Sequence, residues 1–219
     1  MPVTFPLSTA DFLELLPVAS ITMHLPEIVE ISRTGGGEVL TEDLGPRLWQ
    51  GTVELGKLLT REAEEAQTMI DLLRGAGRSF FAFDTRSPGP RLDLTGAILG
   101  AATPQIRALG SDARVMQLKG LPPGYQLVRG DRLSFDYSSN PTRTALHRIV
   151  DASVVANGAG ETGDFEVMPE IRAGAAVDAT VRLVRPQCKV VLVPGSVEAG
   201  SRRSHLSEGM SFQFIQTLR

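Results

Sequence analysis

The sequence predicts a mainly β protein of the α+β class: an antiparallel sheet domain with one packed α-helix, and a small β-barrel inserted into it. Three observations predict this. The 22 glycines and 14 prolines are spread through the 219 residues and separate short periodic segments, as is typical of strands joined by turns. One segment has a helical apolar period. Short strands also interrupt the chain between the helix and its last two strands, which indicates an insertion.

The N-terminal segment, residues 1–19, is expected to be an arm with a short turn of helix around residues 11–16. The run from Ile21 to Arg33 is predicted as a strand that is bent or lies at an edge, because Pro26 interrupts its hydrogen-bonding pattern. Gly35-Gly36-Gly37 follows as a turn.

The run from Leu48 to Leu55 alternates strictly between apolar and polar side chains. This period of two predicts a half-buried antiparallel strand. Its buried face is expected to carry Trp49, Gly51, Val53 and Leu55.

A helix is predicted over residues 61–74. Thr60 is the expected N-cap, and glutamates at 62, 64 and 65 favour the positive end of the helix dipole. The apolar stripe is formed by Ala66, Met69, Ile70 and Leu73. A single stripe implies that the helix packs on the sheet rather than inside a core.

A phenylalanine-rich strand, Arg78–Asp84, leads into a Pro/Gly-rich crossing at residues 85–90, where a boundary is expected. The predicted domains are therefore residues 1–88 with 187–219, and an inserted barrel at 89–186. Six strands are expected in the insert: Gln105–Ala108, Arg114–Lys119, Arg132–Tyr137, Leu146–Val155, Asp164–Val167 and Ala179–Val184.

The chain is expected to return to the first domain with a strand at Lys189–Val193. A loop then runs from Gly195 to Ser207, and a final strand from Gly209 to Leu218. In that strand Met210, Phe212, Phe214 and Gln216 share one face. Because the strand is low in charge, we expect an edge that is paired or covered in an assembly.

Composition and charge argue against several classes of partner. Lys and Arg number 22 against 25 Asp and Glu, for a net charge of −3, whereas nucleic-acid binding needs clustered basic residues. The Arg202-Arg203 pair is interpreted as a solvated loop. No apolar run approaches a membrane span, and the N-terminus does not resemble a signal peptide. With one cysteine, the chain is expected to be soluble and made in a reducing cytoplasm.

Residues with catalytic potential do not form a motif. His24, His147 and His205 lack metal-ligand spacing, so no metal or cofactor is expected. Cys188 lies in an alternating apolar run and is interpreted as a buried hydrophobe, and Asp84 as a turn cap. We expect no catalytic, cofactor-binding or metal-binding residues, and no enzyme.

Several stretches together resemble proteins of phage tail modules. They are Leu48–Leu55, Glu64–Gly75, Phe81–Pro90, Gly124–Leu127, Gly130–Phe135, Leu146–Val150, Phe165–Arg172 and Gly209–Phe212. The chain is similar to the distal tail proteins of siphophages and related prophages. Members have a β-rich belt domain with one helix, and some carry an OB-like barrel before the last strands.

This resemblance implies a virion protein at the tail tip. It implies a hexameric ring that joins the tail tube protein to the baseplate hub protein around the tape-measure protein, without catalytic residues. One departure is the apolar stretch Ala10–Leu16, which is expected to pack on a neighbour. The alternatives are another tail ring, such as a tube or terminator protein, and a carbohydrate- or nucleic-acid-binding module. The module would need an exposed aromatic cluster, and its candidates are Tyr125, Phe135, Tyr137 and Phe165.

Overall fold

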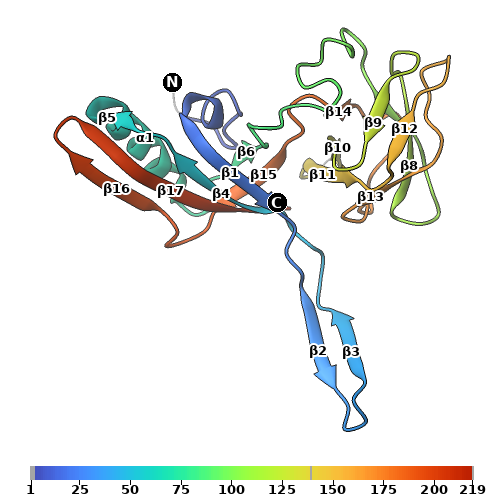
Figure 1. The fold of residues 1–219 in the computed structure, drawn as a ribbon, viewed down its shortest axis with the longest axis horizontal. Coiled ribbons are helices and arrows are strands. Elements are labelled where there is room, and N and C mark those ends of the chain that lie inside the picture. The colour runs from blue at the N-terminus through green and yellow to red at the C-terminus, as the bar shows by residue number, and fades with distance from the viewer. Residues whose placement is uncertain (1–2, 139, 219) are drawn as a thin grey trace.

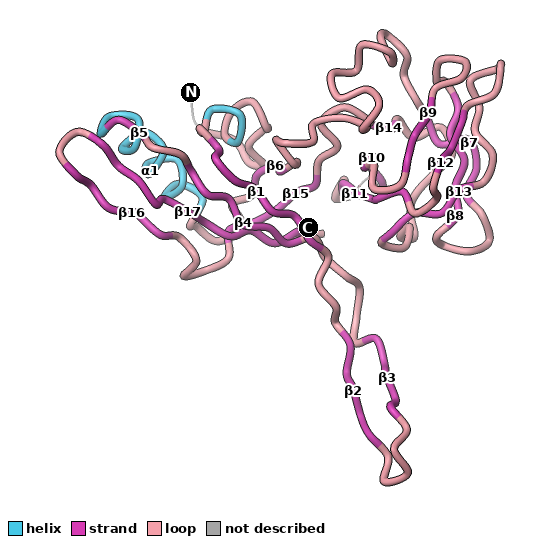
Figure 2. Tube along the Cα trace, viewed as in Figure 1, coloured by secondary structure: helices cyan, strands magenta, loops and turns pink. Residues whose placement is uncertain are grey.

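The computed structural model describes residues 3–138 and 140–218. It shows two β units side by side and a hairpin that projects away from both (Figure 1). The fold is mainly β with antiparallel sheets, as the sequence predicts. Most of the remaining chain is loop and turn (Figure 2).

The elements follow one another in this order. The first half of the chain forms η1 (Leu13–Leu15), β1 (Val18–His24), β2 (Val29–Arg33), β3 (Val39–Asp43), β4 (Gln50–Leu55), β5 (Leu58–Leu59), α1 (Thr60–Leu73), β6 (Phe80–Ala82) and β7 (Gln105–Leu109). The second half forms β8 (Val115–Lys119), β9 (Gln126–Val128), β10 (Arg132–Tyr137), β11 (Arg143–Ile149), β12 (Ser153–Val155), β13 (Phe165–Met168), β14 (Val181–Arg182), β15 (Cys188–Leu192), β16 (Glu198–Arg203) and β17 (Leu206–Gln216).

The first unit, called the belt unit here, is a sheet in the order β1-β4-β17-β15-β6, with β16 and β5 paired to β17. Helix α1 and the N-terminal segment cover one face of it. The predicted alternation is confirmed: Trp49, Val53 and Leu55 are buried from the β4 segment, and Met210, Phe212, Phe214 and Gln216 from β17. Phe12 packs edge-on against Phe80 at 4.9 Å in this core. Of the predicted helical stripe, Ala66, Ile70 and Leu73 are buried as expected, whereas Met69 is half-buried.

The second unit, called the barrel unit here, is a sheet in the order β14-β10-β11-β13-β8-β7. Its ends approach each other, because Gln105 of β7 bridges Thr180 beside β14 and the N–H of Ile106 donates to the carbonyl of Ala179 at 3.0 Å. The sheet is therefore barrel-like and nearly closed. Closure removes the exposed edges that an open sheet would present.

The two units have separate hydrophobic cores. The first draws on residues from Leu7 to Phe83 and from Cys188 to Phe214. The second draws on residues from Leu99 to Leu183. Leu146 of β11 is an exception, because it packs in the first core. The domain boundaries at 88–89 and 186–187 stay a prediction.

Several predicted elements differ from the structure. The expected strand from Ile21 to Arg33 is two strands separated at Leu25–Ile28: β1 pairs with β4, whereas β2 pairs with β3. Strand β3 was not expected. Proline at 26 ends the first strand rather than bending it, since it offers no N–H to a sheet.

The C-terminal region also differs. The expected loop from Gly195 to Ser207 contains β16, which pairs with β17. Strand β17 is not an edge, because it pairs with β4, β15 and β16. Its low charge therefore reflects pairing with neighbours within the chain. The expectation of an edge strand is wrong, and cover by an assembly stays a prediction.

Smaller corrections concern boundaries and the N-terminal segment. Leu146–Val155 is split into β11 and β12 by a turn, and β9 was missed. Helix α1 begins at Thr60 rather than after it, so the N-cap is Leu59, whose N–H donates to the Glu62 carboxylate at 2.9 Å.

Phe12 and Leu13 are buried in the chain's own core, so this stretch does not need a neighbour to pack on. Of the predicted arm, residues 1–2 lie outside the described residues.

Candidate functional site

The three histidines lie in different environments. His24 ends β1 and is exposed, His205 lies in the turn between β16 and β17, and His147 is buried in β11. In the part of the chain that the structure describes, no group of three or more His, Cys, Asp or Glu residues is placed to hold a metal ion.

His147 is held inside the barrel unit. Its Nδ1 lies 2.7 Å from the carbonyl oxygen of Pro169, so Nδ1 carries the hydrogen and donates. The ring stacks on Phe135 at 5.3 Å. Burial lowers the pKa of His147 to about 4, and the positive charge of Arg172 acts in the same direction. A neutral imidazole of this kind fills a core position.

Cys188 is fully buried in β15, and burial raises the pKa of its thiol to about 12. A protonated, inaccessible thiol is a poor nucleophile. Its interpretation as a buried hydrophobe is therefore consistent with its surroundings.

The junction between the two units is built around Trp49. Its Nε1–H donates to the carbonyl of Leu146 at 2.7 Å. The guanidinium groups of Arg132 and Arg148 lie 5.9 and 5.1 Å from its ring centre. Arg132 also forms an ion pair with Asp84 at 2.8 Å, with both side chains largely buried. Asp84 additionally accepts the N–H of Arg86, which is the turn cap that the sequence predicts.

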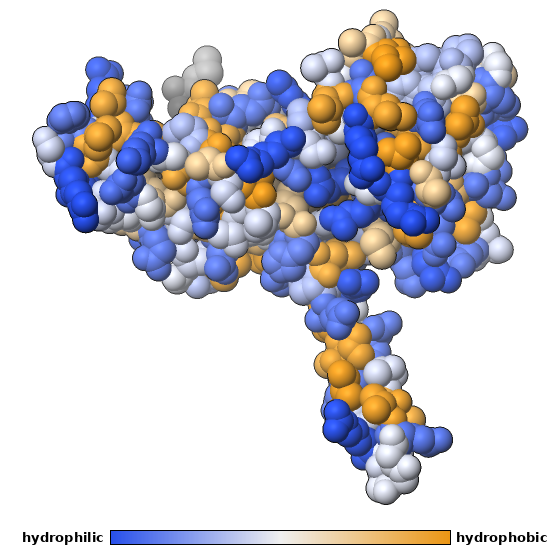
Figure 3. Space-filling view, in the orientation of Figure 1, coloured by the Kyte–Doolittle hydropathy of each residue, from blue (hydrophilic) through white to orange (hydrophobic). Residues whose placement is uncertain are grey.

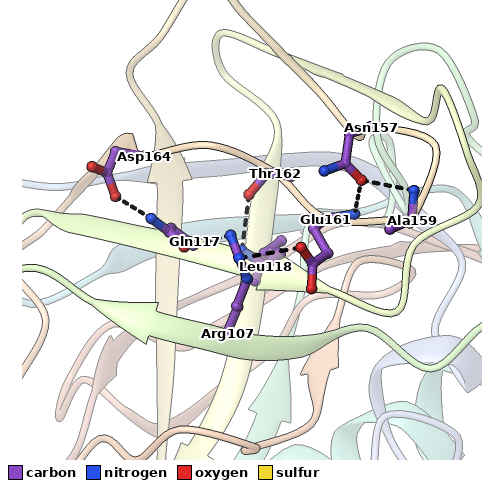
Figure 4. A network of polar contacts seen from close by, with 8 residues as sticks. All are labelled: Arg107, Gln117, Leu118, Asn157, Ala159, Glu161, Thr162 and Asp164. Atoms are coloured by element: carbon purple, nitrogen blue, oxygen red, sulfur yellow. Dashed lines mark hydrogen bonds and ion pairs between the residues drawn. The ribbon is translucent and has the colours of Figure 1, made fainter.

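A polar network on the barrel unit stabilises turns (Figure 4). The carbonyl oxygen of the Asn157 side chain accepts the N–H groups of Ala159 and Glu161. The hydroxyl of Thr162 accepts the N–H of Leu118 at 2.9 Å, and Gln117 donates to Asp164 at 2.7 Å. Because these groups satisfy backbone or one another, the network is structural.

The aromatic side chains of the insert do not form a binding platform. Tyr125, Phe135, Tyr137 and Phe165 are all buried, between 0% and 4% exposed. Stacking on bases or sugars needs an accessible ring face. These four residues therefore do not form the exposed aromatic cluster that would favour a carbohydrate- or nucleic-acid-binding module.

The most conspicuous surface feature is the β2–β3 hairpin. It projects away from both units (Figure 1), and every residue of its two strands except Val29 is exposed. Ile31, Val39 and Leu40 expose 64%, 56% and 56% of their surface. The apolar groups are visible along its length in Figure 3.

The two ends of the hairpin are held together at its root. The guanidinium of Arg47 donates to the carbonyls of Leu25 at 2.9 Å and Pro26 at 3.3 Å. The N–H of Leu44 donates to Ile28 at 2.8 Å. These bonds join the two ends of the hairpin to each other.

The strand register separates two faces of the hairpin, since directly opposed residues share a face. Ile31 faces Thr41, and Arg33 faces Val39. On the other face Glu30 lies directly opposite Glu42. Residues 27–45 contain five acidic side chains and one arginine, for a net charge of −4, so the rest of the chain carries +1 of the total of −3. Sequence reasoning missed the second strand of this hairpin, because Val39–Asp43 has two apolar residues followed by three polar ones rather than an alternating pattern.

Comparison with protein-family models gives no match, and comparison with curated proteins finds no relative. Within the described residues, no helix is long and apolar enough to cross a membrane.

Proposed function

We propose that this protein is a structural subunit of a phage tail tip, a distal tail protein that assembles with identical copies into a ring. By the resemblance of its sequence, the ring is hexameric and connects the tail tube protein to the baseplate hub protein around the tape-measure protein. In this proposal the barrel unit is the OB-like insert of the family, the protein has no catalytic role, and its final location is the virion.

The observation that carries the proposal is the projecting β2–β3 hairpin. An isolated two-stranded hairpin is at best marginally stable in water, and this one exposes apolar side chains on both faces. A hairpin that is anchored at its root but unsupported along its length gains stability when a partner covers it. An identical subunit is the simplest such partner.

The preference for a ring over a two-fold dimer comes from the resemblance, since reciprocal docking of two hairpins would also close a dimer. In this proposal the projecting hairpin contacts a surface of the next copy that differs from itself. Such heterologous contacts produce a closed ring when the rotation between copies closes.

The alternative of a glycan- or nucleic-acid-binding module is not favoured by the barrel unit's four buried aromatics. A tube or terminator ring would use the same kind of contact. These ring proteins differ in which tail proteins they bind.

The test measures the mass of the purified chain by light scattering after size exclusion, with negative-stain images of the main peak. We expect hexamer-sized rings with a central hole. A matched variant replaces residues 28–44 with a short Gly/Ser linker, which removes no fully buried side chain and should leave the belt sheet folded. We expect this variant to be monomeric. Rings that persist without the hairpin would contradict the role given to it, and a wild-type chain that forms no ring would contradict the function.

A further inference from the structure

A second surface of the chain has the opposite charge character to the hairpin. Four arginines gather beside the junction of the two units; we call Arg91, Arg129, Arg132 and Arg148 the arginine cluster. The guanidinium of Arg91 donates to the carbonyl of Arg129 at 3.2 Å, and Arg132 lies directly opposite Arg148 in the β10–β11 register.

The charge of this cluster is only partly compensated. Asp84 pairs with Arg132 at 2.8 Å. Asp131 supplies a second negative charge, and its two oxygens accept the N–H groups of Arg91 and Val128, each at 2.8 Å. Four arginines therefore stand against two carboxylates. Within the described residues Arg91, Arg129 and Arg148 form no ion pair. Burial lowers the pKa of Arg148, and the nearby positive charge of Arg132 lowers it further.

Apolar side chains border the cluster. The loop that follows Arg91 exposes Leu92, Leu94 and Ile98 by 50%, 48% and 61%. Arg91 and Arg129 are themselves exposed. The surface therefore combines accessible positive charge with apolar area.

The hairpin has the complementary combination. Its exposed apolar residues accompany a net charge of −4, and Glu30 opposes Glu42 directly, an arrangement that destabilises an isolated strand pair. A surface of positive charge would relieve the repulsion between these two glutamates. The hairpin projects away from its own barrel unit (Figure 1), so it cannot supply that charge within one chain.

We infer that the β2–β3 hairpin of one copy docks on the arginine cluster of the next copy, with Glu30 and Glu42 facing Arg91 and Arg129 and the apolar side chains of both surfaces in contact. The inference rests on the proposed ring. The hairpin is long enough to reach across a neighbouring unit, since the ten residues from Pro26 to Gly35 extend about 30 Å, comparable to the diameter of a domain of about 100 residues.

Nucleic acid is the competing occupant, because exposed arginines also bind phosphates. A second copy is favoured for two reasons: the chain itself supplies an acidic, apolar segment of suitable length, and the cluster has apolar neighbours rather than exposed aromatic rings for stacking.

The test is charge reversal on the full-length chain. One variant carries Glu30→Arg and Glu42→Arg, a second carries Arg91→Glu and Arg129→Glu, and a third combines all four changes. A control, Arg61→Glu with Arg203→Glu, changes the charge by the same amount as the second variant at exposed positions of the belt unit. The readout is the protein concentration at which light scattering detects assembly, at low and at physiological salt, with circular dichroism to verify folding.

We expect each reversal alone to raise the assembly concentration by about tenfold or more, the combined variant to restore assembly, and the control to behave as wild type. Salt should weaken the wild-type contact, because exposed charges are screened. If wild type forms rings but the single reversals assemble equally well, or the combined variant is not restored, the docking inference is overturned while the ring stands. Arginine reversal that abolishes binding of a single-stranded oligonucleotide and leaves assembly unchanged assigns the cluster to nucleic acid. A wild-type chain that never assembles overturns both the inference and the ring.

Discussion

The indole Nε1–H of Trp49 donates a 2.7 Å hydrogen bond to the backbone carbonyl of Leu146, 97 residues away in the chain. Trp49 belongs to the core of the belt unit, and Leu146 lies in β11 of the barrel unit but packs in the same core. This contact connects the unit that bears the hairpin to the unit that bears the arginine cluster.

Replacing Trp49 by Phe should destabilise the protein by about 2–4 kcal/mol, because it leaves the buried carbonyl of Leu146 without a donor and leaves a cavity. Chemical denaturation followed by circular dichroism measures this. Leu15→Ala is the control, since Leu15 is 70% exposed and should change stability by no more than about 0.5 kcal/mol. Equal effects of the two substitutions would contradict the role of the contact.

Removing the charge of Asp84 by Asp84→Asn should cost about 3 kcal/mol, because Arg132 would stay largely buried without its carboxylate and beside Arg148. The two side chains of the pair are 15% and 13% exposed. As a control, Glu65→Gln removes the partner of Arg61 in a pair whose side chains are 67% and 90% exposed. Exposed pairs contribute little, so a control loss as large as that of Asp84→Asn would count against this reading.

Gly51→Ala should disrupt the centre of the belt sheet. An added Cβ would lie 2.4 Å from the ring of Phe214 and 2.4 Å from the backbone oxygen of Thr22, and overpacking of this kind costs about 1–3 kcal/mol or more. Gly45→Ala, which would meet nothing within 4 Å, is the matched control. A thermal-unfolding midpoint that drops for Gly51→Ala alone is the expected result.

His147 should make stability depend on pH. Its pKa is lowered from 6.5 to about 4 in the fold, so between these values the unfolded state binds more protons than the folded state. The contribution, on the order of 3 kcal/mol, is present above pH 6.5 and is lost as the pH falls towards 4. Denaturation curves measured across this pH range should show that the free energy of unfolding falls more steeply with decreasing pH in wild type than in His147→Gln. Identical pH profiles would exclude the histidine as the cause.

Cys188 should not react with a thiol reagent in the native protein, because its buried thiol has a pKa of about 12. After unfolding in guanidinium chloride it should react at the rate of an ordinary cysteine. Rapid labelling of the folded chain would contradict its burial.

The sequence by itself determined the mainly β class, the position of the one predicted helix, the buried alternation of β4 and β17, and the structural roles of Asp84 and Cys188. These features depend on the spacing of apolar residues along the chain and on side-chain chemistry, both of which can be read from short stretches of sequence.

Only the tertiary structure decided which strands pair. It moved β17 from an expected edge to the interior of the sheet, placed β16 beside it, and separated the hairpin from β1. Strand pairing depends on contacts between residues far apart in the chain, and an exposed hairpin and a central strand can share the same local alternation. The arginine cluster likewise exists only because β10, β11 and the loop around Arg91 meet in space.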